Sequence, residues 1–394
     1  MFSQRTHWNL EENAYTRALR RHRKAGKRVL DLTASNPTSC GFQYDETAIL
    51  GALGDPASLR YEPEPKGIPS ARAAVARYYG EKGAGAVDPE NLILTTGTSE
   101  AYSFLFRLLC EPGDEVLIAH PSYPLFDFLA TIQDVKLRPF QFVYDHGWQI
   151  DFHSLREALG ERTRAIVVVH PNNPTGQFIG AGEADELNAI CATRGLALIV
   201  DEVFLDYGMK DTGAAKKRHG TFAANGAALT FVLSGLSKIA ALPQMKLGWI
   251  AATGPAELVR ESMARLEVVA DTYLSLNAPL QCALPALLAQ RVAMQRQIAA
   301  RVESSLAELD ALLSRQKPVS RLKVEGGWYA VLRVPAVQSD EELAIRLLEE
   351  RGVLAHPGHF YDFAEPGYLV ISLLTPREEF AEGAREMLAC VGRL

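Results

Sequence analysis

Several polar side chains of this sequence follow apolar segments, where ligands of open parallel sheets bind. Lys238 comes after residues 232–237, an apolar run that ends in small residues, and a second lysine, Lys246, lies further along. In such surroundings a lysine is expected to have a lowered pKa and to form a Schiff base with a carbonyl compound. A solvated loop lysine is the alternative, and Lys238 taken alone leaves both open.

Two further segments place a polar side chain after an apolar run. Asp201 follows residues 196–200, so its carboxylate is expected to be half-buried and to need a partner, for which a protonated pyridine nitrogen would serve. A helix N-cap aspartate is the alternative. Asn173 lies in a turn with two prolines and a glycine, which can present its amide to a ligand oxygen or be an ordinary turn.

The sequence contains no motif of a nucleotide, metal or redox site. No dinucleotide-binding glycine fingerprint follows the first expected strand, and no phosphate loop ends in Gly-Lys-Ser/Thr, which argues against a nicotinamide or nucleotide enzyme. The cysteines are widely separated, without the spacing of a metal or redox site. They are Cys40, Cys110, Cys191, Cys282 and Cys390. We expect reduced thiols in a reducing compartment and no metal.

Between about residues 45 and 280, short apolar runs alternate with amphipathic stretches, and these elements must position the residues named above. Short apolar runs are expected to be strands covered on both faces. They are residues 91–95, 115–119, 165–169, 196–200, 229–233 and 247–251. Helices are expected between them, at residues 100–109 and 182–194. This alternation predicts an α/β fold with a mainly parallel sheet.

The pattern changes after Pro279. Residues 280–316 are expected to form one or two long helices, and an α+β layer of strands and helices is expected beyond them. Its elements are residues 327–334, 340–351, 367–374 and 378–388. We therefore predict a large domain over residues 46–280 and a smaller α+β domain made of residues 1–45 and 281–394.

Composition limits the possible partners. The chain has 394 residues, of which 47% are hydrophobic and 22% charged, as in ordinary globular proteins and unlike disordered ones. Its net charge of −6 gives no basic surplus for nucleic acid or an anionic membrane. The N-terminus has no signal-peptide pattern, and no apolar run approaches the ~18 residues of a membrane span. We expect a cytoplasmic protein.

The three segments, taken together and in this order, resemble those of one enzyme family. Asn173-Pro-Thr-Gly, then Asp201, then Ser-Lys238 are similar to the motifs of the class I/II aminotransferases of fold type I, relatives of aspartate aminotransferase that use pyridoxal phosphate (PLP). The resemblance extends from about Asn36 to the C-terminus. It implies a large PLP-binding domain, a smaller domain, and a ping-pong transfer of an amino group between an amino donor and a 2-oxo acid.

Two other functions stay open from the sequence. A PLP-dependent lyase, decarboxylase or racemase of the same fold, within a biosynthetic pathway, would use the same lysine and aspartate. A non-enzymatic PLP-binding or regulatory protein would also bind the cofactor, but the sequence has no appended DNA-binding helices and no basic patch, and Lys238 is intact.

The resemblance implies a role for each matching residue. Lys238 would carry PLP as an aldimine and shuttle a proton, and Asp201 would pair with the pyridinium nitrogen. Asn173 would hydrogen-bond to the ring oxygen O3′. Tyr123, in His120-Pro-Ser-Tyr-Pro, would stack on the ring, with a core tyrosine as the alternative.

The resemblance also implies a phosphate site. The amides of Thr98 and Ser99 open an expected helix, where an anion is stabilised by free N–H groups and the helix dipole. Lys246 matches the cationic phosphate ligand, and the Ser234 hydroxyl is a further candidate, because the family's usual hydroxyl position holds glycine here. Tyr61 resembles the tyrosine that reaches the phosphate of the partner subunit, which implies a homodimer with shared active sites.

Two positions depart from the family pattern. Phe204 stands where the family commonly has a tyrosine that donates to O3′, so we expect a raised aldimine pKa unless Tyr207 compensates. Val370 stands where the family has the arginine for the substrate α-carboxylate. Either another cation takes its place, for which Arg333 and Arg60 are the candidates, or the substrate's carboxylate is absent or bound by backbone amides. Asn36, in the N-terminal segment that aligns with the family's substrate contacts, is a further candidate. For both arginines, an ordinary surface position is the alternative.

Overall fold

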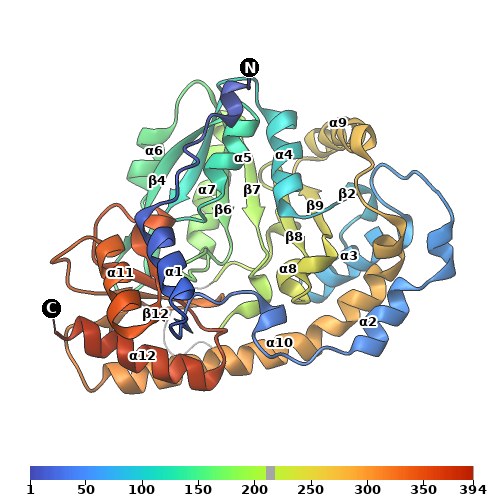
Figure 1. Cartoon of the computed structure of the whole chain (residues 1–394). Helices are drawn as coiled ribbons and strands as arrows, with labels where there is room; N and C mark the ends of the chain where they lie inside the picture. Colours follow the sequence, from blue (N-terminus) through green and yellow to red (C-terminus); the bar gives the residue numbers. More distant parts are fainter. Residues whose placement is uncertain (210–217, 394) are drawn as a thin grey trace.

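The computed structural model describes residues 1–209 and 218–393. Its central sheet has the strand order β2-β9-β8-β7-β6-β3-β4-β5 (Figure 1). The strands are β2 (Leu92–Thr95), β3 (Glu115–His120), β4 (Lys136–Tyr144), β5 (Trp148–Ile150), β6 (Thr163–Val169), β7 (Ala197–Asp201), β8 (Thr230–Gly235) and β9 (Gly248–Thr253). Strands β4, β3, β6, β7 and β8 pair in parallel, whereas β9 and β5 are antiparallel to their neighbours. The expected mainly parallel sheet is confirmed.

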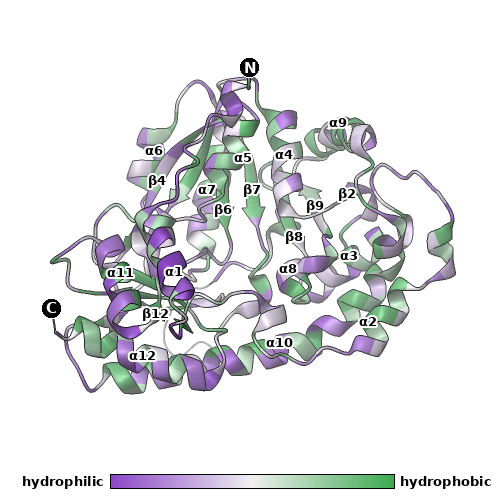
Figure 2. Ribbon diagram, viewed as in Figure 1, coloured by the Kyte–Doolittle hydropathy of each residue, from purple (hydrophilic) through white to green (hydrophobic). Residues whose placement is uncertain are grey.

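Helices cover both faces of this sheet. On β7, Leu198 and Val200 pack into one hydrophobic cluster, and Ala197 and Ile199 pack into the other. The continuous apolar strands follow from this double burial, and β7 is coloured as hydrophobic in Figure 2. The covering helices are α4 (Thr98–Leu109), α5 (Phe126–Ile132) and α9 (Ala256–Tyr273) on one face, and α3 (Pro69–Glu81), α6 (Phe152–Ala158), α7 (Ala181–Arg194) and α8 (Leu236–Ile239) on the other.

A second, smaller sheet lies in the C-terminal part of the chain. Its order is β10-β11-β14-β13, and all neighbours are antiparallel. The elements are β10 (Ser320–Arg321), β11 (Tyr329–Arg333), α11 (Asp340–Arg351), β13 (His356–Pro357), β14 (Tyr368–Ser372) and α12 (Arg377–Val391). One helix, α10 (Ala278–Leu313), runs along the base of the molecule from α2 (Glu46–Leu53) to α12 (Figure 1).

The N-terminal segment packs against this C-terminal layer. Helix α1 (Ala14–Lys24) contacts α11, and β1 (Leu30–Asp31) pairs in parallel with β12 (Val353–Leu354). The Tyr15 hydroxyl donates to the backbone oxygen of Ala355 at 3.1 Å. Short 3-10 helices complete the described chain at Gln4–Thr6, Pro37–Ser39, Pro56–Leu59, Pro89–Asn91, Leu205–Tyr207, Phe222–Ala224, Pro243–Met245 and Gly358–Tyr361. Within the described ranges, no helix has the length and apolar content of a membrane span.

Candidate active site

A cavity of about 210 Å³ lies at the carboxyl ends of the central strands. Six of the residues expected from the sequence line it: Thr98, Ser99, Tyr123, Asn173, Asp201 and Lys238. They follow five different strands, because the carboxyl ends of parallel strands meet at one edge of a sheet. The chain thus brings these six side chains together from segments that are widely separated in the sequence.

Asp201 holds the one carboxylate among the described residues that line this cavity, and it is buried. It ends β7, Oδ1 accepts the Val203 amide at 3.0 Å, and Oδ2 accepts the Tyr102 hydroxyl at 3.2 Å. Burial raises its pKa to about 6, although both hydrogen bonds and the charge of Lys238 act in the opposite direction. A group that brings a positive charge to Asp201 would therefore be stabilised there.

Lys238 lies on α8, directly after β8, with its side chain partly accessible through the cavity. Its Nζ atom is 4.9 Å from the ring centre of Trp328 and 5.6 Å from that of Phe204. Burial lowers its pKa to about 8, while Asp201 opposes the shift. An amine with this pKa is partly unprotonated near neutral pH and can act as a nucleophile or a base.

Asn173 and Tyr123 form further parts of the wall. Asn173 is 8% exposed, and its buried Oδ1 has no hydrogen-bond partner within residues 1–209 and 218–393. An unpaired buried amide oxygen is costly, so it indicates that this amide meets a ligand. Tyr123 is 39% exposed, and its ring meets Phe126 edge-on with ring centres 6.2 Å apart. The ring of Tyr123 is therefore not a fully buried core side chain.

The first turn of α4 gives the cavity an anion-binding edge. Gly97 precedes this helix without a side-chain cap, and Thr98 and Ser99 begin it. The first amides of a helix have no partner within it, and they concentrate positive potential. A phosphate would be stabilised at these amides.

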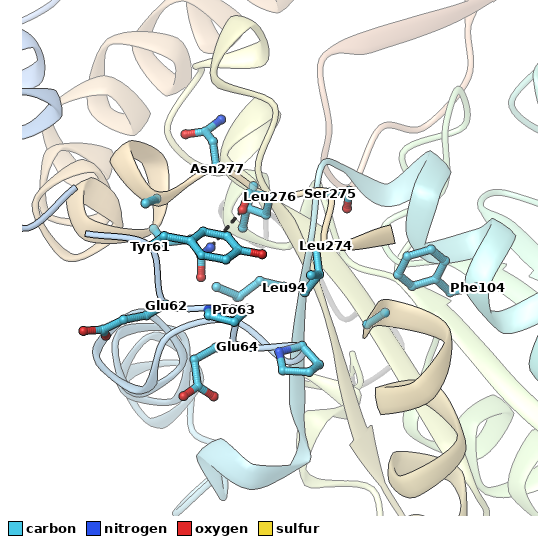
Figure 3. Close-up of a pocket in the computed structure, with 15 residues that line it drawn as sticks. Tyr61, Glu62, Pro63, Glu64, Leu94, Phe104, Leu274, Ser275, Leu276 and Asn277 are labelled. Atoms are coloured by element: carbon cyan, nitrogen blue, oxygen red, sulfur yellow. Dashed lines mark hydrogen bonds between the residues drawn. The ribbon is translucent and has the colours of Figure 1, made fainter. Parts of the chain in front are cut away.

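Three expected residues lie outside the cavity. Ser234 is fully buried, and its hydroxyl donates to the backbone oxygen of Glu202 at 3.4 Å. Lys246 is exposed, next to Leu247, which does line the cavity. Tyr61 is 80% exposed and lines a different cavity, formed with residues 274–278 (Figure 3).

The structure adds three polar residues that sequence reasoning missed. Ser35, Ser237 and Tyr329 line the cavity. Ser237 directly precedes Lys238, so its place beside the lysine was a usable signal. Ser35 and Tyr329 come from distant parts of the chain, and no local pattern marks them. Asn36 does not line the cavity, because its Oδ1 accepts the Thr38 amide at 3.1 Å and caps a 3-10 helix.

Comparison with known structures places the fold among the aminotransferases. The chain superposes on alanine aminotransferase from Pyrococcus furiosus with a TM-score of 0.90, 23% identity and full coverage of both chains. A mutant aspartate aminotransferase of Thermus thermophilus gives a TM-score of 0.83 at 23% identity, with 99% of each chain covered. The expected α/β fold type I architecture is confirmed.

Sequence comparison identifies the family. The sequence model of "Aminotransferase class I and II" matches residues 9–386, so the chain belongs to this family. Alanine aminotransferase of Mycobacterium tuberculosis is 29% identical over 381 residues, 94% of this chain and 85% of that protein. Glutamate-pyruvate aminotransferase AlaA of Haemophilus influenzae is 26% identical over 355 residues, 89% of this chain and 87% of its own length.

The expected function class is thereby confirmed: the protein is a PLP-dependent aminotransferase that acts on an amino acid and a 2-oxo acid. When bound, PLP supplies an electron sink that makes the Cα–H bond of an amino compound acidic. The cavity fits this cofactor, because it combines a buried carboxylate at Asp201, an amine at Lys238, an amide at Asn173 whose oxygen has no partner among the described residues, and an anion-binding helix start at Thr98.

Proposed function

We propose that Lys238 is the residue that binds PLP covalently and moves the proton during amino-group transfer. The observation that carries this proposal is that Lys238, Asp201, Asn173 and Tyr123 line one cavity, together with the start of α4. The lowered pKa of Lys238, about 8, supports both roles, because its amine gains and loses a proton near neutral pH.

The other lining residues hold and orient the cofactor in this proposal. Asp201 keeps its negative charge against the ring nitrogen, and the Asn173 amide donates from Nδ2 to the ring oxygen. Tyr123 covers the ring face. The amides of Thr98 and Ser99 bind the phosphate, with Lys246 as a charge nearby. We assign the hydroxyl role expected of Ser234 to Ser237, because only Ser237 lines the cavity.

We further propose that the active enzyme is a homodimer in which Tyr61 completes the partner's phosphate site. Tyr61 is 80% exposed, and Leu59 on the same segment is 90% exposed. Figure 3 shows the Tyr61 ring at the cavity formed with residues 274–278, and Lys238 is not among the residues that line this cavity. An aromatic side chain with this exposure is stabilised when a second subunit covers it.

The large domain of residues 46–280 and the smaller domain of residues 1–45 and 281–394 remain part of this proposal. The two separate sheets support the division. We also propose a cytoplasmic enzyme of a biosynthetic pathway. All five cysteines are free, which agrees with a reducing compartment.

The visible spectrum of the holoenzyme tests the proposal. Single amino acids and simple amines are added without a 2-oxo acid, and the cofactor is expected to pass to its amine form with at least one donor. A subsequent 2-oxo acid should restore the original spectrum. Bound cofactor that no donor converts would contradict the assigned roles, and the reaction products would then be analysed for lyase, decarboxylase or racemase activity.

A further inference from the structure

The part of the cavity that can meet a substrate is almost free of charge. Among the described lining residues, Lys238 is the single cation and Asp201 the single carboxylate, and none is an arginine. Both have cofactor roles in the proposed function. A substrate carboxylate would therefore meet hydroxyls and amides there. Placing a carboxylate among neutral groups is costly compared with placing it against a guanidinium.

Strand β14 brings no arginine to the cavity of Lys238. Val370 pairs with Val331 and His356, and Ser372 pairs with Tyr329. Side chains alternate along a strand, so Val370 shares a sheet face with Tyr329, which lines the cavity. Val370 is fully buried. The position at which relatives carry a guanidinium thus presents an apolar side chain.

The arginines considered as replacements are engaged elsewhere. Arg333 lies two pairs further along β11, with its guanidinium carbon 5.9 Å from the ring centres of Tyr144 and Tyr368. Arg60 is exposed, 3.5 Å from a Glu62 carboxylate oxygen, and lines a separate cavity. Neither lines the cavity of Lys238.

Arg301 is a third arginine of this region, on α10. It donates to the backbone oxygens of Cys40 at 3.2 Å and Leu374 at 2.8 Å. Its guanidinium therefore holds two segments of backbone together and does not line the cavity of Lys238.

Two hydroxyls stand at this wall instead. Ser35 and Tyr329 both line the cavity. Burial raises the pKa of Tyr329 to about 12, so its phenol is protonated and able to donate at neutral pH. Behind it lies His356, whose Nδ1 is 3.0 Å from the Tyr361 hydroxyl; burial lowers the pKa of this imidazole, and the charge of Asp31 opposes the shift.

We propose that Ser35 and Tyr329 form the subsite for the group beside the amine on the substrate's reacting carbon, and that this subsite accepts a neutral amide as readily as a carboxylate. The inference rests on the proposed function of the same cavity. Hydroxyls donate to an amide oxygen and to a carboxylate oxygen alike, whereas a guanidinium favours the carboxylate through its charge. Amino-acid amides are therefore donors of this enzyme.

The chemistry balances for such a donor. The amino group of an amino-acid amide stays with the enzyme, the Cα–N bond is replaced by a carbonyl whose oxygen comes from water, and a 2-oxo amide leaves. Lys238 takes the Cα proton and returns it to the cofactor. The amide group itself is unchanged, so mass spectrometry of the 2-oxo amide identifies the reaction.

Matched donor pairs test the proposal with the holoenzyme. L-alanine is compared with L-alaninamide, and L-phenylalanine with L-phenylalaninamide, at equal concentrations of free amine. The rates of cofactor conversion within each pair are expected to agree to about tenfold. Tyr329→Phe should slow both members of a pair. Val370→Arg should raise the acid-to-amide ratio by about 100-fold, whereas Val370→Met, of similar length without charge, should leave it unchanged.

Equilibrium binding provides a readout that does not require turnover. Calorimetry with 3-phenylpropanoate and 3-phenylpropanamide, which have no amine to transfer, should give Kd values within about tenfold of each other for wild type. Because both ligands are tested on wild type, this measurement shows whether the subsite prefers a carboxylate to an amide even if Val370→Arg fails to fold. Ser35→Ala should weaken both ligands to a similar extent.

A clear preference for the acid overturns the inference. That outcome is an acid-to-amide ratio above about 100 in wild type, unchanged by Tyr329→Phe. If Arg60→Ala then removes the preference, an arginine of the second subunit binds the carboxylate. If no donor of any kind converts the cofactor, the proposed function fails, and the calorimetric pair still decides the nature of the subsite.

Discussion

The hydroxyl of Tyr207 donates to the backbone oxygen of Lys238 at 2.6 Å. Tyr207 is buried and stacks edge-on against Trp328. Its proton is therefore used to fix the backbone that carries the lysine. Phe204, which is 2% exposed, has no hydroxyl to offer the cofactor, and Tyr207 does not compensate for it. The structure thus answers whether Tyr207 replaces the hydroxyl that is missing at position 204: it does not.

Phe204→Tyr is expected to lower the pKa of the lysine-bound cofactor. A phenol at this position adds a hydrogen bond to an anionic ring oxygen, and hydrogen bonds to an anion stabilise it. The shift is expected to be about one pKa unit, since a hydrogen bond to a charged group contributes roughly 1.5 kcal/mol. A spectral pH titration of both holoenzymes measures it. Indistinguishable pKa values would show that position 204 does not address the ring oxygen.

Lys238→Ala is expected to abolish amino-group transfer, with turnover reduced at least about 1000-fold. The fold should persist, because the side chain contributes one amine against the rings of Phe204 and Trp328. Activity and the circular dichroism melting curve are measured together. Gln244→Ala, an exposed position of the same loop, is the control for handling losses. Turnover within tenfold of wild type would contradict the role of Lys238.

Asp201→Asn is expected to stabilise the apoprotein more at pH 8 than at pH 5. Burial raises the pKa of Asp201 from 3.8 to about 6, so the native state binds a proton more readily than the unfolded state. Ionisation therefore costs stability, beginning near pH 4 and reaching about 3 kcal/mol above pH 6. The substitution removes this cost.

Urea unfolding of both apoproteins at pH 5 and pH 8 measures the difference. Glu202 also titrates, because burial raises its pKa to about 8, and the charge of Asp201 adds to this rise. Removing that charge makes ionised Glu202 less costly, so it adds to the gain in stability at pH 8. The same variant should retain PLP less well, since it has no charge for the ring nitrogen. A stability gain that is equal at the two pH values would contradict the raised pKa of Asp201.

Gly235→Ala is expected to destabilise the protein by about 1–3 kcal/mol. A Cβ atom at this position would lie 2.7 Å from the Leu247 backbone oxygen and 2.9 Å from the Cα of Gly248. This close approach of β8 and β9 leaves no room for a hydroxyl side chain at position 235. Gly182→Ala, on α7 with no atom within 4 Å of the added Cβ, is the control and should be neutral or stabilising. Equal melting temperatures for the two variants would refute the steric argument.

The sequence predicted the parts of the fold that local patterns determine. The strand that ends at Asp201 and the strand that leads to Lys238 are apolar at successive positions because helices cover both faces. Strand β4 has no such pattern. Its residues include Lys136, Arg138 and Pro139, and it lies next to the edge strand β5, so its polar side chains reach solvent.

The residues of the site also fall into two groups: those that a local pattern predicts and those that long-range packing brings in. Asn173, Asp201 and Lys238 each stand at the end of a recognisable apolar run, so their meeting follows from parallel strand order. Ser35 and Tyr329 meet through long-range packing of the smaller sheet against the N-terminal segment, for which Ser372 is an example: its hydroxyl donates to the Ala34 backbone oxygen at 2.6 Å. Such contacts depend on tertiary register, which a single sequence does not encode locally.

Tyr61→Ala is expected to weaken cofactor retention without altering the cavity of Lys238 in its own subunit. The side chain is 80% exposed and lies outside that cavity, so a loss of PLP requires that it acts on another subunit. One hydrogen bond to a phosphate contributes roughly 1.5–3 kcal/mol, which predicts about 10- to 100-fold weaker binding. Leu59→Ala, on the same exposed segment but without a hydroxyl, is the matched control, and Tyr61→Phe separates the effect of the hydroxyl from that of the ring.

Equilibrium dialysis measures the retention of PLP, and sedimentation measures the oligomeric state. A monomer in solution, or unchanged retention in Tyr61→Phe and Tyr61→Ala alike, would contradict a shared site, because a hydroxyl that binds the partner's phosphate cannot be removed without cost.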